Sequence, residues 1–377
     1  MKLEEPVPPT VLAQIRTPFL EVGAEALDAP TVQPLGQLLD LAGEALRERL
    51  FVLQSDGGEE ACLRPDFTIA AARAFVAAGA SSARYYYEGH GFRVAPPGAS
   101  RAEEFLQLGL EVFGSSDRAP QDADIATIAW RAAAAGGRDD LALTLGDVAL
   151  FSAFIESLDL SSALRSRLER SFSSPRRLWA ELSVGGDEPA PRAGDRLADL
   201  LGDLSESEAA GALEEIWRLS GIQAVGGRSA LEIVHRLRER SAIAKAPHLS
   251  TSQAEPIRRF LAISDRPATA LEAISRLAGS GDRRLRAGLE AWERRLSALL
   301  AQGVPPEAMT FSAAFGRAFG YYDGPLFEIR SAALGDDQPV AAGGRYDTLP
   351  GRLGGKASVG AVGCMVRPGR AWAGSAP

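Results

Sequence analysis

The stretch GFRVAPPGASRAEEFLQLGLEVFG, residues 91–114, decides how the chain folds. With the residues before it, this stretch forms two runs, ARYYYEGHGFRVA (83–95) and EEFLQLGLEVFG (103–114), which alternate between apolar and polar residues and are rich in aromatic side chains. The Pro/Gly/Ser loop PPGAS joins them. This pattern predicts a β-hairpin. Gln107 and Glu111 lie four residues apart on the second strand, so both face the same side of the sheet. With Arg93 on the first strand, the hairpin resembles half of a catalytic site.

The loop of this hairpin does not complete such a site. A phosphate-binding loop uses cationic side chains, whereas this loop offers Ala95, Pro96 and Glu103. The stretch by itself therefore leaves open whether it is an active site or the remains of one.

The flanking sequence predicts further elements of both kinds. Apolar runs on either side of DGGEE predict a second hairpin. Residues 66–79 have helical spacing. Asp66 or Thr68 is the expected N-cap of this helix, and Gly79 lies just beyond its end. A helix is also expected over residues 122–137, and a strand over residues 141–147.

The texture of the chain changes after these elements. Residues 148–300 carry apolar side chains at helical spacing with charged exposed faces. Strand-like runs return at residues 310–334, 338–349 and 357–367. This order favours an α+β fold, with a mostly antiparallel sheet flanked by helices and interrupted by a helical insertion.

Composition narrows the class of protein. The chain has 377 residues, 46% of them hydrophobic, and a net charge of −8, so it can bury a sizeable core and has no general attraction to nucleic acid. It has no long uncharged apolar run and no secretory signal pattern. Its two cysteines and three histidines share no metal-ligand spacing. We therefore expect a cytoplasmic protein without metal or cofactor.

Five segments resemble, in family order, the motifs of histidyl-tRNA synthetases, which are class II aminoacyl-tRNA synthetases. They are LRPDFT (63–68), the hairpin region (84–114), RAFGYYDGPLFE (317–328), AAGGRYDTL (341–349) and ASVGAVGCMVR (357–367). The resemblance implies a class II synthetase-like core over residues 1–377, interrupted at about 150–300 by a largely helical insertion. It also implies a homodimer.

The resemblance implies a histidine-binding pocket as well. Its residues would be Asp66, Thr68, Arg93, Gln107, Glu111, Arg317, Tyr321 and Tyr322. A carboxylate at Asp66 suits the α-ammonium group of histidine, and arginines suit its α-carboxylate. Glu111 and Tyr322 would bind the two imidazole nitrogens.

By the same resemblance, the nucleotide site is vestigial, and its remnants would be Arg101, Glu103 and Arg367. Ala95 replaces an acidic residue that contacts adenine in the family, and Glu103 replaces an arginine. A bound triphosphate needs several cations around it. We therefore expect weak ATP binding, no aminoacylation and no catalytic residue.

A histidine pocket without ATP chemistry, and without the expected anticodon-binding domain, resembles the regulatory subunits of ATP phosphoribosyltransferase. Such a non-catalytic subunit would form a hetero-oligomer with a short-form catalytic subunit, serve the first step of histidine biosynthesis and take part in feedback inhibition by histidine. Membrane or tRNA binding is not expected. Two alternatives stay open: a histidine-activating enzyme of synthetase type, and a histidine-sensing scaffold for another partner.

Some residues have two interpretations. The three tyrosines of RYYYEG (residues 84–89) favour cross-strand packing over ligand contact. Arg345 in GGRYD fits either a ligand arginine or an ion pair. Cys62 and Cys364 are interpreted as small buried hydrophobic residues.

Overall fold

The computed structural model describes most of the chain. The described residues are 3–54, 60–96, 98, 101–172, 174–182, 204–220, 229–231, 233–235, 237–238, 249–278, 283–316, 319–335, 337–356 and 359–374.

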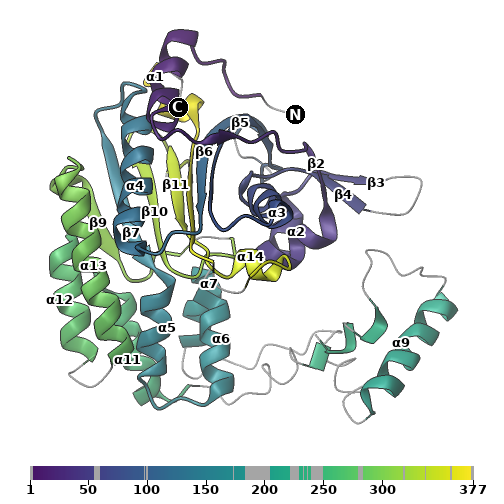
Figure 1. The fold of residues 1–377 in the computed structure, drawn as a ribbon. Coiled ribbons are helices and arrows are strands. Elements are labelled where there is room, and N and C mark those ends of the chain that lie inside the picture. Colours follow the sequence, from purple (N-terminus) through teal and green to yellow (C-terminus); the bar gives the residue numbers. More distant parts are fainter. Residues whose placement is uncertain are drawn as a thin grey trace.

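A nine-stranded sheet runs through the centre of the described part of the chain (Figure 1). In spatial order its strands are β1 (Glu25–Ala26), β5 (Ala83–Phe92), β6 (Glu104–Phe113), β12 (Ala361–Val366), β11 (Ala341–Arg345), β10 (Pro325–Ser331), β7 (Leu141–Asp147), β9 (Met309–Ser312) and β8 (Ser264–Asp265). Of the neighbouring pairs in this described sheet, β1–β5 and β7–β9 are parallel and the other six are antiparallel. The α+β fold with a mostly antiparallel sheet is confirmed.

Both predicted hairpins are present. Strands β5 and β6 pair along ten residues, from Ala83 opposite Phe113 to Phe92 opposite Glu104. The second hairpin belongs to a smaller antiparallel sheet with the order β2 (Val32–Pro34), β4 (Glu60–Leu63) and β3 (Val52–Gln54). Its turn, residues 55–59, lies outside the described residues.

Helices cover both faces of the large sheet, which explains why β6 is buried on both sides. On one face α4 (Arg118–Ala134) packs on β11 and β12, and α1 (Pro9–Leu20) and α13 (Arg283–Ala301) pack on α4. Leu108, Leu110 and Val112 of β6 join this core. On the other face lie α2 (Leu35–Ala42) and α3 (Thr68–Ala78). Because side chains alternate along a strand, Gln107 and Glu111 point to this second face, as predicted.

Helix α3 ends as expected but begins differently. Gly79 adopts φ 61° at its C-terminus, a left-handed conformation that favours glycine. The predicted N-cap is wrong, because the N-cap position is Phe67 and no side chain caps the helix. The hydroxyl of Thr68, the first helical residue, instead donates a hydrogen bond to Glu111. A contact in the tertiary structure therefore overrides the local capping preference.

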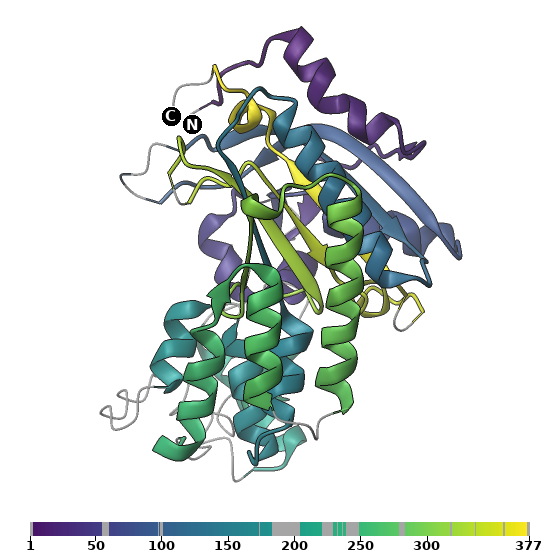
Figure 2. The same cartoon turned by 90° about the vertical axis from the view of Figure 1, so that its left-hand side faces the viewer.

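The region between β7 and β9 is helical where it is described. Its helices are α5 (Val148–Glu156), α6 (Ser162–Phe172), α7 (Pro175–Leu182), α9 (Glu206–Ser220), α11 (Thr251–Leu261), α12 (Pro267–Ala278) and α13. Helices α5, α6, α7 and α11 lie below one end of the sheet, whereas α13 extends up beside the sheet to pack on α4, and α12 packs against α13 (Figures 1 and 2). The shorter helices of the fold are η1 (Glu44–Arg49), η2 (Pro306–Ala308), α14 (Leu349–Arg352) and α15 (Pro368–Ala371).

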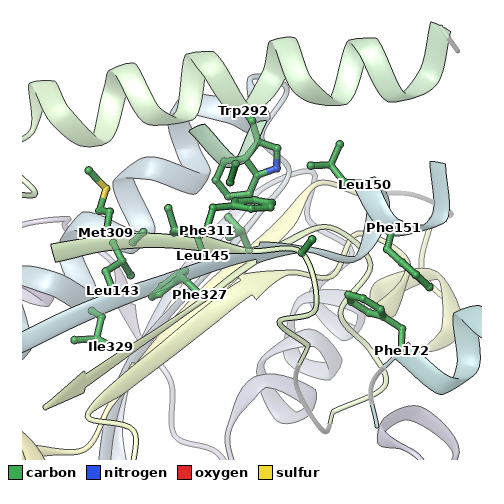
Figure 3. Close-up of a cluster of buried hydrophobic side chains, with 14 of the residues drawn as sticks. Leu143, Leu145, Leu150, Phe151, Phe172, Trp292, Met309, Phe311, Phe327 and Ile329 are labelled. Atoms are coloured by element: carbon green, nitrogen blue, oxygen red, sulfur yellow. The ribbon is translucent and has the colours of Figure 1, made fainter. Parts of the chain in front are cut away.

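Aromatic packing joins these helices to the sheet (Figure 3). Trp292 of α13 meets Phe311 of β9 edge to face, with ring centroids 5.0 Å apart. Phe151 of α5 stacks on Phe172 of α6 at 4.3 Å. All four rings are almost completely buried, so the helical region and the sheet share one hydrophobic core.

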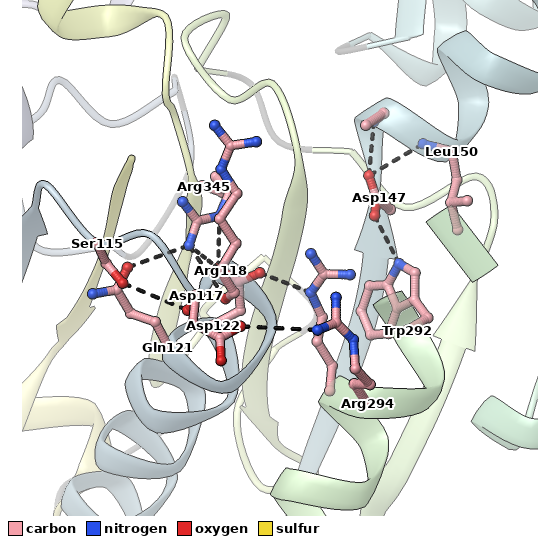
Figure 4. Close-up of polar contacts among 12 residues, drawn as sticks. Ser115, Asp117, Arg118, Gln121, Asp122, Asp147, Leu150, Trp292, Arg294 and Arg345 are labelled. Carbon is pink, nitrogen blue, oxygen red and sulfur yellow. Dashed lines mark hydrogen bonds and ion pairs between the residues drawn. The ribbon is translucent and has the colours of Figure 1, made fainter. Parts of the chain in front are cut away.

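Buried polar contacts fix the same junction (Figure 4). One Asp147 oxygen accepts hydrogen bonds from the first turn of α5, and the other accepts one of 2.7 Å from Trp292 Nε1. Asp122 of α4 pairs with Arg295 of α13 at 2.7 Å and with Arg345 of β11 at 2.6 Å. These carboxylates connect four separate segments of the chain: α4, the β7–α5 junction, α13 and β11.

Candidate functional site

The second face of the sheet brings the predicted histidine-binding residues together. Seven of them line one small cavity: Asp66, Thr68, Arg93, Gln107, Glu111, Tyr321 and Tyr322. The eighth, Arg317, lies outside the described residues. The cavity measures about 20 Å³, which is room for about one water molecule. Side chains must therefore move before an amino acid can enter.

Glu111 lines this cavity, and both of its carboxylate oxygens accept hydrogen bonds from other side chains. Thr68 Oγ1 donates a hydrogen bond of 2.7 Å to Oε1, and the Tyr346 hydroxyl donates one to Oε2. Burial raises the pKa of Glu111 to about 8, although these two hydrogen bonds oppose the rise; the charge of Asp66 adds to it. The Glu111 carboxyl group is therefore largely protonated at neutral pH.

A glycine on the neighbouring strand makes room for this carboxyl group. A Cβ atom on Gly363 of β12 would lie 1.6 Å from Glu111 Oε2 and 2.8 Å from the Leu110 carbonyl oxygen. No side chain fits there, which accounts for the glycine in the VGCMVR segment.

Gln107 provides the polar group that lacks a partner in this cavity. Its Nε2 donates a 3.2 Å hydrogen bond to the Tyr87 hydroxyl, which lies 3.4 Å from the carbonyl oxygen of Cys364. Its Oε1 accepts no hydrogen bond, although the residue is only 1% exposed. A buried amide oxygen without a donor is costly, so this atom marks where a donor group of a ligand would be stabilised.

Two tyrosines of this site were missed by sequence reasoning. Tyr87 was interpreted as packing; it does stack on Phe67 at 4.3 Å, but it also lines the cavity. Its position on the strand could have indicated this role, because Tyr87 of β5 lies opposite Gly109 of β6. A Cβ atom on Gly109 would lie 2.1 Å from the Tyr87 hydroxyl, so the glycine makes room for that side chain. Tyr346 gave no such signal, because its contact with Glu111 spans 235 residues of sequence.

The open question about Arg345 is answered by its surroundings. Its guanidinium donates to Asp122 at 2.8 Å and to Asp347 at 2.8 Å, and the residue is 3% exposed. Arg345 therefore belongs to the ion pairs of Figure 4, whereas the next residue, Tyr346, reaches the cavity side. Cys62 and Cys364 are both buried, as expected, and burial raises the pKa of each thiol.

A second, larger cavity of about 430 Å³ adjoins the first, and arginines dominate its wall. The described lining includes six arginines and two acidic residues: Arg49, Arg93, Arg101, Arg330, Arg367, Arg370, Glu328 and Asp337. Arg93, Phe319 and Met365 line both cavities. We call this second space the arginine cavity.

The three predicted remnants of a nucleotide site are not equivalent. Arg101 and Arg367 line the arginine cavity, whereas Glu103 is not among its lining residues. The Glu103 carboxylate accepts a 3.3 Å hydrogen bond from the backbone of Ala95. The negative charge of Glu103 therefore lies beside the arginine cavity and not in its wall.

The described His, Cys, Asp and Glu side chains form no group of three or more that could hold a metal ion. Across the same part of the chain, no helix combines the length and the apolar character needed to cross a membrane.

Comparison with known proteins defines the class first. The family model for histidyl-tRNA synthetase matches residues 10–240 and 222–368. Solved structures with similar folds include an ATP phosphoribosyltransferase regulatory subunit/histidyl-tRNA synthetase from Bacillus halodurans, with a TM-score of 0.66, 20% identity and coverage of 99% of this chain and 83% of that one. A histidyl-tRNA synthetase from Nostoc has a TM-score of 0.59 and 17% identity, and the match covers 96% of this chain and 69% of that one. The chain has the class II synthetase-like fold and belongs to the histidyl-tRNA synthetase family.

Closer relatives place it on one branch of that family. An ATP phosphoribosyltransferase regulatory subunit from Mesorhizobium japonicum is 37% identical over 369 residues, covering 95% of each chain. One from Agrobacterium fabrum is 36% identical over 361 residues, covering 94% of each. This protein therefore belongs to the ATP phosphoribosyltransferase regulatory subunits. The regulatory, non-catalytic assignment made from the sequence is confirmed at the level of the family.

Proposed function

We propose that this chain senses histidine for a separate catalytic subunit of ATP phosphoribosyltransferase, and that histidine binds in the cavity around Glu111. The observation that carries the proposal is the convergence of Asp66, Arg93, Gln107 and Glu111 on one buried space. The Asp66 and Gln107 oxygens complement the α-ammonium group of histidine, and the Arg93 guanidinium complements its α-carboxylate. The Glu111 carboxyl group complements the imidazole.

The small size of the cavity indicates how binding would alter the protein. Thr68 and Tyr346 occupy the Glu111 oxygens in the present conformation. An imidazole N–H would replace at least one of these donors, and the aromatic side chains above it would shift. Tyr321 and Tyr346 already contact each other edge to face at 5.9 Å. A ligand at Glu111 would therefore reposition the segments that carry these two rings.

We also propose how the chain assembles and how its helical region is arranged. The partner would be a short-form catalytic subunit in a hetero-oligomer, and the class II core would form a homodimer. The helices between β7 and β9 would be an insertion into a single core, as expected from the sequence. The cytoplasmic location stays a prediction.

The test is to purify this chain together with the short-form catalytic subunit of the same genome and to measure phosphoribosyl-ATP formation with and without histidine. Activity only in the mixture, reduced by histidine, is the expected result. A catalytic subunit that is equally active alone, or no complex at all, contradicts the proposal. Histidine-dependent exchange between ATP and pyrophosphate would instead support the histidine-activating alternative.

A further inference from the structure

We infer that the Tyr87 hydroxyl is a positioning group. It holds the Gln107 side chain with its amide oxygen toward the cavity around Glu111, so that this cavity selects ligands that carry an α-ammonium group. The inference rests on the proposed function, because it concerns the same cavity. It adds a residue that sets the specificity of that cavity through Gln107.

The direction of two hydrogen bonds carries the argument. The Tyr87 hydroxyl donates to the Cys364 carbonyl oxygen at 3.4 Å, and Gln107 Nε2 donates to the Tyr87 hydroxyl at 3.2 Å. A backbone carbonyl oxygen only accepts hydrogen bonds, so the hydroxyl proton must point toward Cys364. The hydroxyl oxygen can then only accept, and the Gln107 amide has to offer it the NH₂ end.

The oxygen end of the same amide is thereby turned toward the cavity. Gln107 Oε1 is buried and has no donor among the described residues, and the side chain lines the cavity around Glu111. An amide turned end over end would present its NH₂ group there instead, which cannot accept a hydrogen bond from an ammonium group. The orientation set by Tyr87 therefore decides whether the cavity offers an acceptor or a donor at this point.

Packing leaves the Tyr87 side chain little freedom to turn its hydroxyl elsewhere. The residue is 1% exposed, and its ring stacks on Phe67 with centroids 4.3 Å apart and an interplanar angle of 6°. Burial raises the pKa of Tyr87 well above its ordinary value, so the hydroxyl keeps the proton that it donates. The hydroxyl is therefore held in place as a neutral donor.

A glycine on β6 keeps the space between these groups open. Gly109 lies opposite Tyr87, and it lies between Gln107 and Glu111 on the same face of the strand. A Cβ atom on Gly109 would lie 2.1 Å from the Tyr87 hydroxyl and 2.5 Å from the Cys364 carbonyl oxygen. A side chain at this position would therefore break the hydrogen bond that fixes the orientation of Gln107.

A fixed acceptor in a buried cavity discriminates between ligands by their donors. The α-ammonium group of histidine offers N–H donors, and Asp66, which lines the same cavity, also suits a cation. The compound 3-(imidazol-4-yl)propionate has the same imidazole and carboxylate but no ammonium group. It leaves Gln107 Oε1 without a donor, so it should bind the natural chain more weakly than histidine does.

The test is a calorimetric titration of the full chain with histidine and with 3-(imidazol-4-yl)propionate. Tyr87→Phe keeps the ring that stacks on Phe67 but leaves the Gln107 amide free to turn. We expect this variant to bind histidine about tenfold more weakly and to bind imidazolepropionate as the natural chain does. Tyr86→Phe is the matched control and should change neither affinity, because its hydroxyl donates to Glu88 at 2.6 Å and its ring packs on the other face of the sheet.

A second background separates positioning from a structural role. Gln107→Leu removes the amide, so adding Tyr87→Phe to it should change the histidine affinity by less than about twofold. A Tyr87 with a purely structural role would weaken histidine binding equally in both backgrounds. Thermal unfolding checks that each variant is folded. One NMR measurement needs no variant: the Nε2 protons of Gln107 should exchange with solvent far more slowly than those of the exposed Gln54.

The outcomes separate this inference from the proposed function. Equal losses for both ligands in Tyr87→Phe, no loss for either, or an equal loss of histidine binding in both backgrounds overturns the role of Tyr87 and leaves histidine in the cavity. Exchange of the Gln107 amide as fast as that of Gln54 does the same. Absence of histidine binding by the natural chain contradicts the proposed function, and this inference falls with it.

Discussion

Two arginines on neighbouring strands are equally buried but have opposite surroundings. Arg345 of β11 and Arg367, directly after β12, are each 3% exposed. Arg345 lies between two carboxylates, Asp122 and Asp347. Arg367 has Glu4 as its ion-pair partner and retains an unsatisfied Nε among other arginines.

The pKa values of the two guanidinium groups follow this difference. The pKa of Arg345 is raised, because the attraction and hydrogen bonds of Asp122 and Asp347 outweigh burial, which would lower it. Burial lowers the pKa of Arg367 to about 10 despite the Glu4 charge. Burial of a charged residue thus does not reveal its role. A matched buried charge holds the fold together, whereas an undermatched one is suited to a ligand.

The largest expected effect comes from removing Arg345, whose charge is balanced by Asp122 and Asp347. Arg345→Gln removes the cation that the buried carboxylates of Asp122 and Asp347 share, while Arg295 still pairs with Asp122 and Arg118 with Asp347. We expect the free energy of unfolding to fall by about 2–3 kcal/mol, measured by urea denaturation. Arg294→Gln, an exposed control, should change it by about 0.5 kcal/mol or less. If Arg345→Gln were as stable as this control, the ion pairs would not hold the junction.

The histidine pocket is a third kind of region, a buried acid held by hydrogen bonds. Glu111→Ala should weaken histidine binding by about 1–3 kcal/mol, because it removes the hydrogen-bonding partner of a buried imidazole. Calorimetric titration with histidine measures this loss, and size-exclusion chromatography checks that assembly is intact. An unchanged histidine affinity would remove Glu111 from the pocket.

The ionisation of Glu111 gives a pH signature. Its pKa of about 8 in the folded chain is above the ordinary value of 4.5, so the folded state binds the proton more tightly than the unfolded state does. Stability should therefore fall as pH rises between these values, by up to about 1.4 kcal/mol per unit. The unfolding free energies of the natural chain and of Glu111→Gln, compared at pH 5 to 7, measure this slope. Parallel curves would contradict the raised pKa.

The smallest effect on stability is expected at Arg367, whose charge is only partly balanced by Glu4. Arg367→Gln removes a cation from among other cations, and the Glu4 carboxylate that it leaves is still partly exposed, at 16%. We expect the free energy of unfolding to change by about 1 kcal/mol or less, in contrast to Arg345→Gln. Urea denaturation of the two variants side by side gives the comparison. A loss as large as that of Arg345→Gln would make Arg367 a structural residue.

Local pattern predicted much of the fold and part of the site. The alternation in residues 83–95 and 103–114 was enough to predict β5, β6 and the shared face of Gln107 and Glu111. The N-cap of α3 could not be predicted, because the Thr68 hydroxyl is used by Glu111 on another element. Arg345 and Tyr346 are adjacent in one motif yet serve different regions, and only the tertiary structure separates them.

The arginine cavity was predicted least well, for a physical reason. Its wall combines Arg49 from η1, Arg93 after β5, Arg330 from β10 and Arg370 from α15. No spacing in the sequence relates these residues. The substitutions at Ala95 and Glu103 indicated lost cations, but they gave no signal of the cations that other segments supply.

The most direct test of the account is a crystal structure of the chain with histidine bound. We expect histidine in the cavity around Glu111, with its imidazole in place of at least one of the donors from Thr68 and Tyr346, and with the cavity enlarged. Histidine bound at another place while this cavity keeps its present hydrogen bonds would contradict it.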